Sequence, residues 1–134
     1  MEKWIEIFKG RVPKDTYQTQ VINGEKHGLI IRLLGNKHIV EIRFGIVLAI
    51  RMLDEGIVQN GIYTNEQLEK FKDHNFQNVI YEIHDGEFLK KISEISMKIV
   101  DAVDCRHYAL ITENYNIDII AQYEPAIEVR KKTL

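Results

Sequence analysis

The feature that most constrains this chain is the dipeptide Gly35-Asn36, which interrupts a run of aliphatic and β-branched residues over 29–44. Glycine followed by asparagine between two such runs predicts a β-hairpin with a two-residue type II′ turn, which would place Leu34 opposite Lys37. Because side chains alternate across a strand, one face of this hairpin is apolar and the other is mixed. The apolar face comprises Leu29, Ile31, Leu33, Val40, Ile42 and Phe44, and the mixed face comprises Ile30, Arg32, Leu34, Ile39, Glu41 and Arg43.

A further strand is expected before this hairpin, over residues 16–22. A three-residue loop, Ile22-Asn23-Gly24, would join it to the hairpin with Tyr17 opposite Leu29, and would put Tyr17, Thr19 and Val21 on the apolar face. The N-terminal half is therefore predicted to be a three-stranded meander. Segment 2–8 fits either a strand or a short helix, and we favour a helix that packs Trp4 onto the domain.

A helix is predicted directly after the hairpin, because Gly45 ends the second strand and Gly56 suits a helix C-terminus. The intervening segment, 46–55, is apolar on almost every side. Such a helix is normally buried between layers of a domain, and this is the reading we favour. The alternative is that one side of it is buried against a second copy of the chain.

Helices and strands alternate in the second half of the chain. Thr64-Asn65-Glu66-Gln67 is a capping box that would begin a short helix ending near residue 73. A strand is expected within 75–84. Asp85 then fits the N-cap of an amphipathic helix extending to Val103, with Glu87 well placed in its first turn.

The chain finishes with a second predicted hairpin, 107–112 and 117–121, joined by a turn at Asn114-Tyr115 that pairs Leu110 with Ile119. Both faces of these strands are fairly apolar, which is typical of strands that are central in a sheet or covered on both sides. Pro125 suggests that 126–129 is an edge strand. The predicted fold class is α+β: a mainly antiparallel sheet, built from the meander and the C-terminal hairpin, with helices packed on one face.

Composition limits the class of protein. A chain of 134 residues with 45% apolar and 28% charged residues suits one globular domain, 1–134. A net charge of −2 gives no basic field for nucleic acid, and no apolar run is long enough to span a membrane. The single cysteine, Cys105, excludes an internal disulfide and, with no signal-peptide pattern in the first residues, favours a cytoplasmic location.

The candidate binding residues lie on the mixed face of the first hairpin. Arg32, Glu41 and Arg43 form a charged stripe there, which Asp118 would extend if the two hairpins are neighbours. Aliphatic residues interrupt the stripe, and mixed exposed surfaces of this kind mark protein interfaces. Tyrosines are enriched at binding hot spots, so the turn residues Tyr115 and Tyr123 are added to the candidate surface.

Two other clusters contain residue types that can perform chemistry. His84, Asp85 and Glu87 would form an acid/base group, but a helix cap and first-turn acid explain the two carboxylates. The second cluster comprises Asp101, Asp104, Cys105 and His107, and it lacks the second ligand pair of a zinc site. We therefore predict no catalytic residue, no metal and no cofactor.

The segments VEIRFG, RMLDEG and HYALITENYNIDII, together with the size of the chain, resemble small uncharacterised bacterial α+β proteins, some of which are immunity partners of secreted polymorphic toxins. The resemblance implies a stoichiometric inhibitor that performs no chemistry, and it transfers no functional residue. The favoured hypothesis is a non-enzymatic protein-binding module whose partner is a toxin domain or a second copy of the chain. The alternative is a small enzyme or ligand-binding protein with a pocket between sheet and helices, using His84 or Cys105 and their neighbours.

Overall fold

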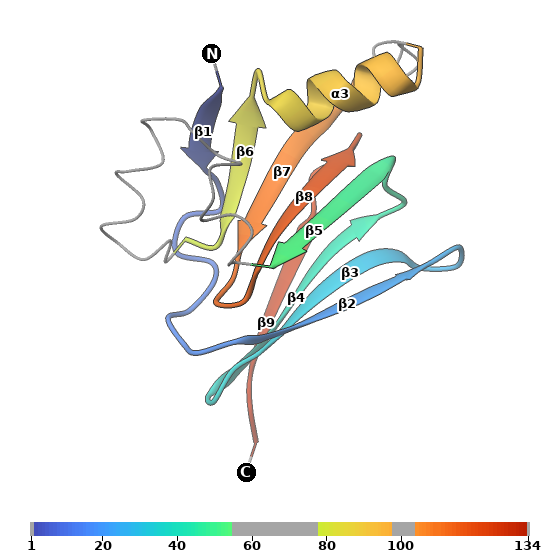
Figure 1. Ribbon diagram of the computed structural model, residues 1–134. Helices are drawn as coiled ribbons and strands as arrows, with labels where there is room; N and C mark the ends of the chain where they lie inside the picture. The colour runs from blue at the N-terminus through green and yellow to red at the C-terminus, as the bar shows by residue number, and fades with distance from the viewer. Residues whose placement is uncertain (1, 55–77, 98–103, 134) are drawn as a thin grey trace.

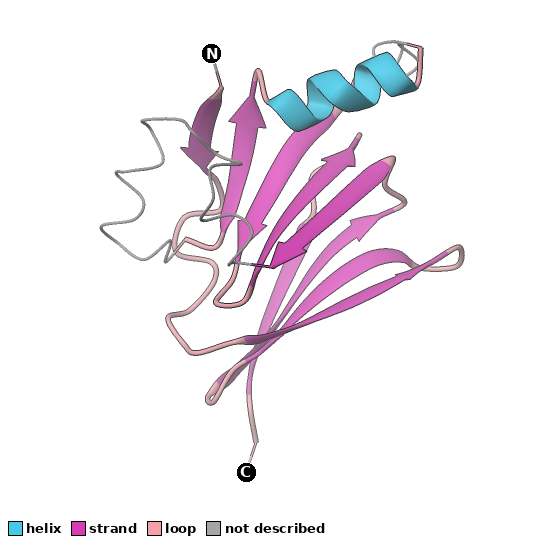
Figure 2. Ribbon diagram, in the orientation of Figure 1, coloured by secondary structure: helices cyan, strands magenta, loops and turns pink. Residues whose placement is uncertain are grey.

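Two antiparallel β-sheets packed face to face make up most of the described part of the protein, as a computed structural model shows (Figure 1). The structure describes residues 2–54, 78–97 and 104–133. Of these residues, strands hold 54% and helix only 9%, so the predicted α+β class with helices packed on one face of a sheet is wrong. Figure 2 shows the predominance of strands and the short helix α3 (Glu87–Ile95).

The order of strands separates the two sheets clearly. The first sheet contains, from edge to edge, β1 (Lys3–Glu6), β6 (Ile80–His84), β7 (Arg106–Ile111), β8 (Tyr115–Ala121) and β5 (Ala49–Asp54). The second contains β2 (Gln18–Gly24), β3 (Gly28–Leu34), β4 (His38–Gly45) and β9 (Ala126–Lys131). The predicted meander is β2-β3-β4, and β9 is the edge strand expected after Pro125.

The main core lies between the sheets and is built from one face of each predicted hairpin. All six residues of the predicted apolar face are at most 3% exposed: Leu29, Ile31, Leu33, Val40, Ile42 and Phe44. Across from them lie Tyr108, Leu110, Ile117, Ile119 and Ala121 of the second hairpin, all fully buried. Burial of this apolar surface is the main stabilising term for the sandwich.

The residue pairings in the hairpins differ from those predicted, but each residue lies on the face of the sheet that was predicted for it. Leu34 pairs with Ile39, and the Gly35 N–H donates to the His38 carbonyl at 2.8 Å, so the two-residue loop is Asn36-Lys37. The predicted pairing of Leu34 with Lys37 is wrong by two positions. The pairing of Leu110 is also displaced by two positions, to Ile117. Since side chains repeat every two residues, an even displacement keeps every residue on its predicted face.

The first hairpin, β2-β3, follows the same rule. Its loop is three residues long, as predicted, but it comprises 25–27 and follows the Gly24–Gly28 pair. Thr19 consequently lies opposite Leu33, and Val21 lies opposite Ile31 on the inner face. Tyr17 precedes the strand and is still buried at 7% exposure.

The helix predicted over 46–55 is absent. Its described part forms a connector that crosses between the sheets, followed by strand β5. Ile46 and Leu48 in the connector are exposed, at 77% and 47%. A short run of aliphatic residues has no periodicity that separates a buried strand from a buried helix, and this ambiguity explains the error. The dimer contact proposed for that helix loses its basis.

The outer face of the five-stranded sheet carries a second, smaller core. Trp4 is 1% exposed and packs with Tyr81, Ile83, Ala109 and Ile111, so its predicted burial is confirmed, although segment 2–8 forms strand β1 and not the favoured helix. Phe88 of α3 is also buried on this side. The helix lies across one end of this sheet (Figure 1), where Phe88 contacts Arg51 and His107.

The ends of α3 differ from the prediction. Its N-cap is Gly86 and not Asp85, which has a φ of 57°. The carboxylate of Glu2, the residue directly before β1, accepts the Glu87 N–H at 3.2 Å and so takes the role assigned to Asp85. The helix ends at Ile95, before Val103.

The strand expected within 75–84 is β6, and the short helix expected over 64–73 lies outside the described residues. None of the helices in the described parts of the chain is long and apolar enough to cross a membrane.

Candidate functional site

The outer face of the four-stranded sheet is the surface on which most of the predicted binding residues meet. We call it the open face, because none of the described helices or strands is packed over it (Figure 1). Register and alternation assign twelve residues to it: Gln18, Gln20, Ile22, Ile30, Arg32, Leu34, Ile39, Glu41, Arg43, Ala126, Glu128 and Arg130.

A chain of ion pairs crosses three strands of the open face. Arg32 on β3 lies 3.4 Å from Glu41 on β4, Arg43 lies 3.6 Å from the same carboxylate, and Arg43 reaches Glu128 on β9 at 3.2 Å. The Glu41 side chain is 12% exposed, whereas those of Arg43 and Glu128 are 50% and 56% exposed. Such exposed pairs contribute about 0–1 kcal/mol each, so they shape the surface more than they stabilise the fold.

Aliphatic side chains surround these ion pairs. Ile30, Leu34 and Ile39 are half-buried among their neighbours, and Ile22 is 41% exposed. The inter-sheet core is already filled from the inner face, so these four residues are not needed there. The open face thus combines apolar area with charged groups fixed in place by their partners, as interface centres and rims do.

Asp118 does not extend this stripe. It lies on β8 of the other sheet, is fully buried, and faces α3. The Arg51 guanidinium donates to Asp118 Oδ2 from Nε at 3.0 Å and from Nη2 at 2.7 Å, while His107 Nε2 lies 2.7 Å from Oδ1. Three strands, β5, β8 and β7, supply this group, which we call the buried triad: Arg51, His107 and Asp118.

Packing around the buried triad is tight. The Phe88 ring of α3 lies 4.6 Å from the Arg51 guanidinium carbon and 5.7 Å from the His107 ring. A Cβ at Gly86 would lie 2.5 Å from His107 Nδ1. This nitrogen is buried, and the described part of the chain offers it no hydrogen-bond partner. The carboxylate beside Nε2 favours the tautomer that carries its proton there, with Nδ1 enclosed by the helix N-terminus.

The buried triad was missed because its members come from three segments. Arg51 fell within the segment predicted to be helical, and Asp118 was assigned to an exposed stripe. The available signal was Asp118 within an otherwise uncharged, largely apolar strand, since a charge buried in a sheet must be paired. Asp118 and His107 are buried and Phe88 of α3 packs against their group, so we assign the triad a structural role.

The two tyrosines of the predicted surface are separated from it. Tyr115 is half-buried and packs against the inter-sheet core, and Tyr123 is 72% exposed in the connection between β8 and β9. The structure therefore joins Arg32, Glu41 and Arg43 and places the other three predicted residues elsewhere.

The residues of the alternative hypothesis, an enzyme or ligand-binding site, do not meet in a cavity. His84 pairs with Glu82 at 3.0 Å on the surface, and Glu87 pairs with Lys90 at 3.6 Å. Cys105 is half-buried, and Asp101 lies outside the described residues. A shallow depression of about 370 Å³ lies elsewhere, lined by Asn23, Gly24, Glu25, Gly28, Ile46 and Val47. Among the described residues, no group of three or more His, Cys, Asp or Glu side chains could hold a metal ion.

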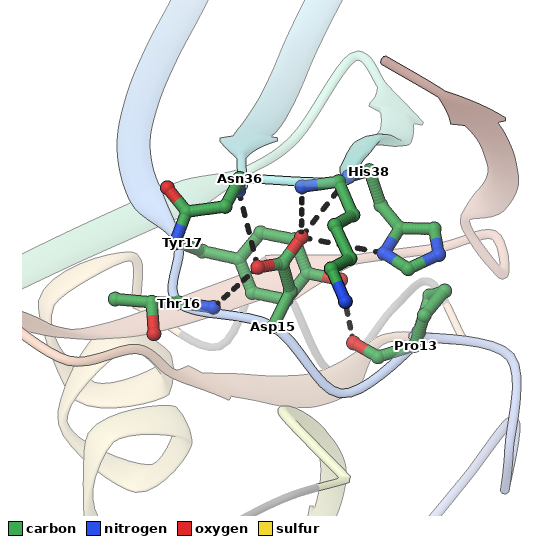
Figure 3. A network of polar contacts seen from close by, with 7 residues as sticks. Pro13, Asp15, Thr16, Tyr17, Asn36 and His38 are labelled. Atoms are coloured by element: carbon green, nitrogen blue, oxygen red, sulfur yellow. Dashed lines mark hydrogen bonds and ion pairs between the residues drawn. The ribbon is translucent and has the colours of Figure 1, made fainter.

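Asp15 is a further polar centre that sequence patterns did not indicate. Figure 3 shows its carboxylate accepting backbone N–H groups from Thr16, Asn36, Lys37 and His38, at 2.8–3.1 Å, with His38 Nδ1 at 3.3 Å. The side chain is 6% exposed. These hydrogen bonds, that from Lys37 first, hold the pKa of Asp15 well below its usual value.

The carboxylate ties the chain before β2 to the β3-β4 turn. Burial, assisted by the Asp15 charge, raises the pKa of the neighbouring Tyr17 phenol to about 12, and its hydroxyl donates to the Pro13 carbonyl. A Cβ at Gly35 would lie 2.2 Å from Asp15 Oδ2, so glycine is required for this approach. We assign Asp15 to stability of the hairpin.

Comparison with known proteins finds no family model that matches the chain, and no curated protein or solved structure matches it either.

Proposed function

We propose that this chain is a non-enzymatic protein-binding module that contacts its partner through the open face. The observation that carries the proposal is the set of aliphatic residues, Ile22, Ile30, Leu34 and Ile39, arranged around a paired charge network on a sheet face that α3 does not cover. Apolar surface of this kind lowers its free energy when a partner excludes water from it.

The partner we propose is a folded protein domain. The strands give the open face a fixed backbone, and the ion pairs hold Arg32, Glu41 and Arg43 in place before binding, which reduces the entropy lost on association. Three arginines and two glutamates lie on it, so an acidic surface with an apolar centre would complement it.

The specific form of the proposal is an immunity protein that neutralises a toxin domain in the cytoplasm. The sequence resemblance supports it, and the single cysteine is consistent with a reducing compartment. No enzyme activity is required of this chain, since neutralisation needs a stoichiometric complex only.

A direct test mixes the purified chain with the product of the adjacent reading frame and measures mass by light scattering. We expect a one-to-one complex with wild type, and binding at least about tenfold weaker for Ile39→Asp and for Arg43→Glu, because both changes disturb the open face. Lys91→Glu on the exposed side of α3 is the matched control and should bind as wild type does.

Two results would count against the proposal. One is a complex whose affinity is the same for wild type, Ile39→Asp and Arg43→Glu, since the contact would then lie elsewhere. The other is the absence of any complex, both with the adjacent product and with toxin domains from the same genome. Circular dichroism of each variant checks that the fold is kept.

A further inference from the structure

The free edges of the two sheets are not equally protected against pairing with another strand. Edge strands expose unpaired backbone N–H and C=O groups, and native proteins protect them with charges, prolines or short lengths. Strand β1 has only four residues, including Lys3 and Glu6, and β5 carries Arg51 and Asp54. Each edge of the five-stranded sheet therefore carries charge.

The two edges of the four-stranded sheet differ sharply. Strand β9 begins after Pro125, contains Glu128, Arg130 and Lys131, and has its Ile127 carbonyl accepting a hydrogen bond from Arg11 at 2.8 Å. Strand β2, with the sequence QTQVING, is seven residues long and has no charge and no proline. Its register with β3 is regular along its whole length, so no bulge interrupts it. Among the described edges, β2 lacks these protections.

The inner face of β2 continues an apolar row. Val21 lies opposite Ile31, which lies opposite Ile42, which in turn lies opposite Ile127 on β9. Val21 packs against the inter-sheet core but is only half-buried, because the row ends at the free edge. A neighbouring strand with an apolar residue at this position would complete its burial.

We propose that β2 pairs antiparallel with β2 of a second copy of the chain, about a two-fold axis at Val21. This register places Val21 opposite its symmetry mate, Thr19 opposite Asn23, and Gln20 opposite Ile22. The two four-stranded sheets become one continuous eight-stranded sheet, and the apolar row runs through it without interruption.

A second copy fits this edge better than an unrelated peptide. Because β2 is uncharged, it has no ion pairs that could select an unrelated strand or fix the direction in which that strand binds. A second copy related by a two-fold axis forms each favourable contact twice. Only a copy also supplies the same apolar row on the same face. Ile22, 41% exposed on the open face, then packs beside its symmetry mate across the diagonal. The inference does not depend on the proposed function.

Disulfide trapping tests the register. In a Cys105→Ser background, Val21→Cys should form a covalent dimer under a mild oxidant, because residues directly opposite in antiparallel strands have Cβ atoms about 4.5–5.5 Å apart. Val129→Cys is the matched control: it is also a valine on the inner face, at the protected β9 edge of the same sheet. It should remain monomeric. Trapping through Val129→Cys instead, or equal trapping of both, would overturn the proposal.

Mass in solution provides the second measurement, on the unmodified chain. Light scattering across a concentration series should show a dimer for wild type, and Ile22→Lys should weaken it by about tenfold or more, because two like charges meet near the axis. Met52→Lys is the control, since Met52 is 40% exposed on edge strand β5. A monomeric wild type at every concentration, or an Ile22→Lys dimer as tight as wild type, would show the inference to be wrong.

Discussion

Charged side chains are buried on one outer face of the sandwich and exposed on the other. On the five-stranded sheet, Asp118 is fully buried beneath α3 and is held by Arg51 and His107 at 2.7 Å. On the four-stranded sheet, Glu41 and its arginine partners lie on the open face at 3.4–3.6 Å. Two ion-pair networks in one small protein can therefore have different roles. The network of Asp118 stabilises the packing of the five-stranded sheet, and we assign the network of Glu41 to binding a partner.

Removal of the Asp118 charge should have the largest effect. Asp118→Asn removes the buried carboxylate that accepts two hydrogen bonds from Arg51 and lies against His107, and we expect the free energy of unfolding to fall by about 3–5 kcal/mol. Urea denaturation measures this. The control, Glu41→Gln on the open face, should lose no more than about 1 kcal/mol. Equal losses for the two variants would refute the contrast between the faces.

A methyl group at Gly86 should have the next largest effect. Gly86→Ala would place a Cβ 2.5 Å from His107 Nδ1, so the helix N-terminus must shift, and we expect a loss of about 1–3 kcal/mol. Gly24→Ala is the matched control, because its Cβ would meet nothing within 4 Å. Thermal unfolding of both variants gives the comparison, and an unchanged midpoint for Gly86→Ala would contradict the tight packing described here.

The Asp15 carboxylate should make stability depend on acid pH. Its pKa is lowered in the folded state from the ordinary 3.8, so its contribution is fully present above that value and is lost as pH falls below it. Asp15→Asn should therefore be less stable than wild type at pH 7, and the difference should shrink as pH falls below about 4. Unfolding midpoints measured from pH 7 to pH 2 test this, with Asp104→Asn as an exposed control. A difference that stays constant over this range would argue against the role of Asp15.

The smallest effect on stability is expected on the open face. Arg43→Gln should change the free energy of unfolding by less than about 1 kcal/mol, because its side chain is 50% exposed and its pairs are screened. A double-mutant cycle with Glu128→Gln measures the coupling directly. A coupling above about 2 kcal/mol would place this network with the buried triad and weaken its assignment to binding.

The sequence predicted which side of each strand is buried better than it predicted which residues are paired between strands. Turn residues such as Gly35 and Gly24 located the hairpins, yet the loops began later than the turn rules suggested. The inner residues, such as Ile31 and Ile42, were still assigned correctly because burial depends on alternation and tolerates an even displacement. The register itself depends on contacts such as those of Asp15 with Asn36 and Lys37 in the β3-β4 turn, which are 21 and 22 residues away in sequence and which no local pattern reveals.

The fold class failed because segments 2–8 and 46–54 contain strands where helices were expected, and because the strands form two sheets and not one. Part of the candidate site failed with the second of these segments. Residues 46–53 are aliphatic enough for a helix or a strand, and only the pairing of β5 with β8 decides between them. Because Arg51 belongs to that strand, its contact with Asp118 could not be anticipated. Arg32, Glu41 and Arg43 were grouped correctly, since a hairpin brings them together through local pairing alone.

The pairing of β9 with β4 has a consequence for how the protein forms during synthesis. Strands β2, β3 and β4 are contiguous in the sequence and can assemble early, but their fourth partner is more than eighty residues further along. Until 126–131 leave the ribosome, the nascent meander exposes β4 as a second bare edge. Long-range pairings of this kind close slowly, so this half-built sheet is the stage at which the nascent chain is most exposed to aggregation.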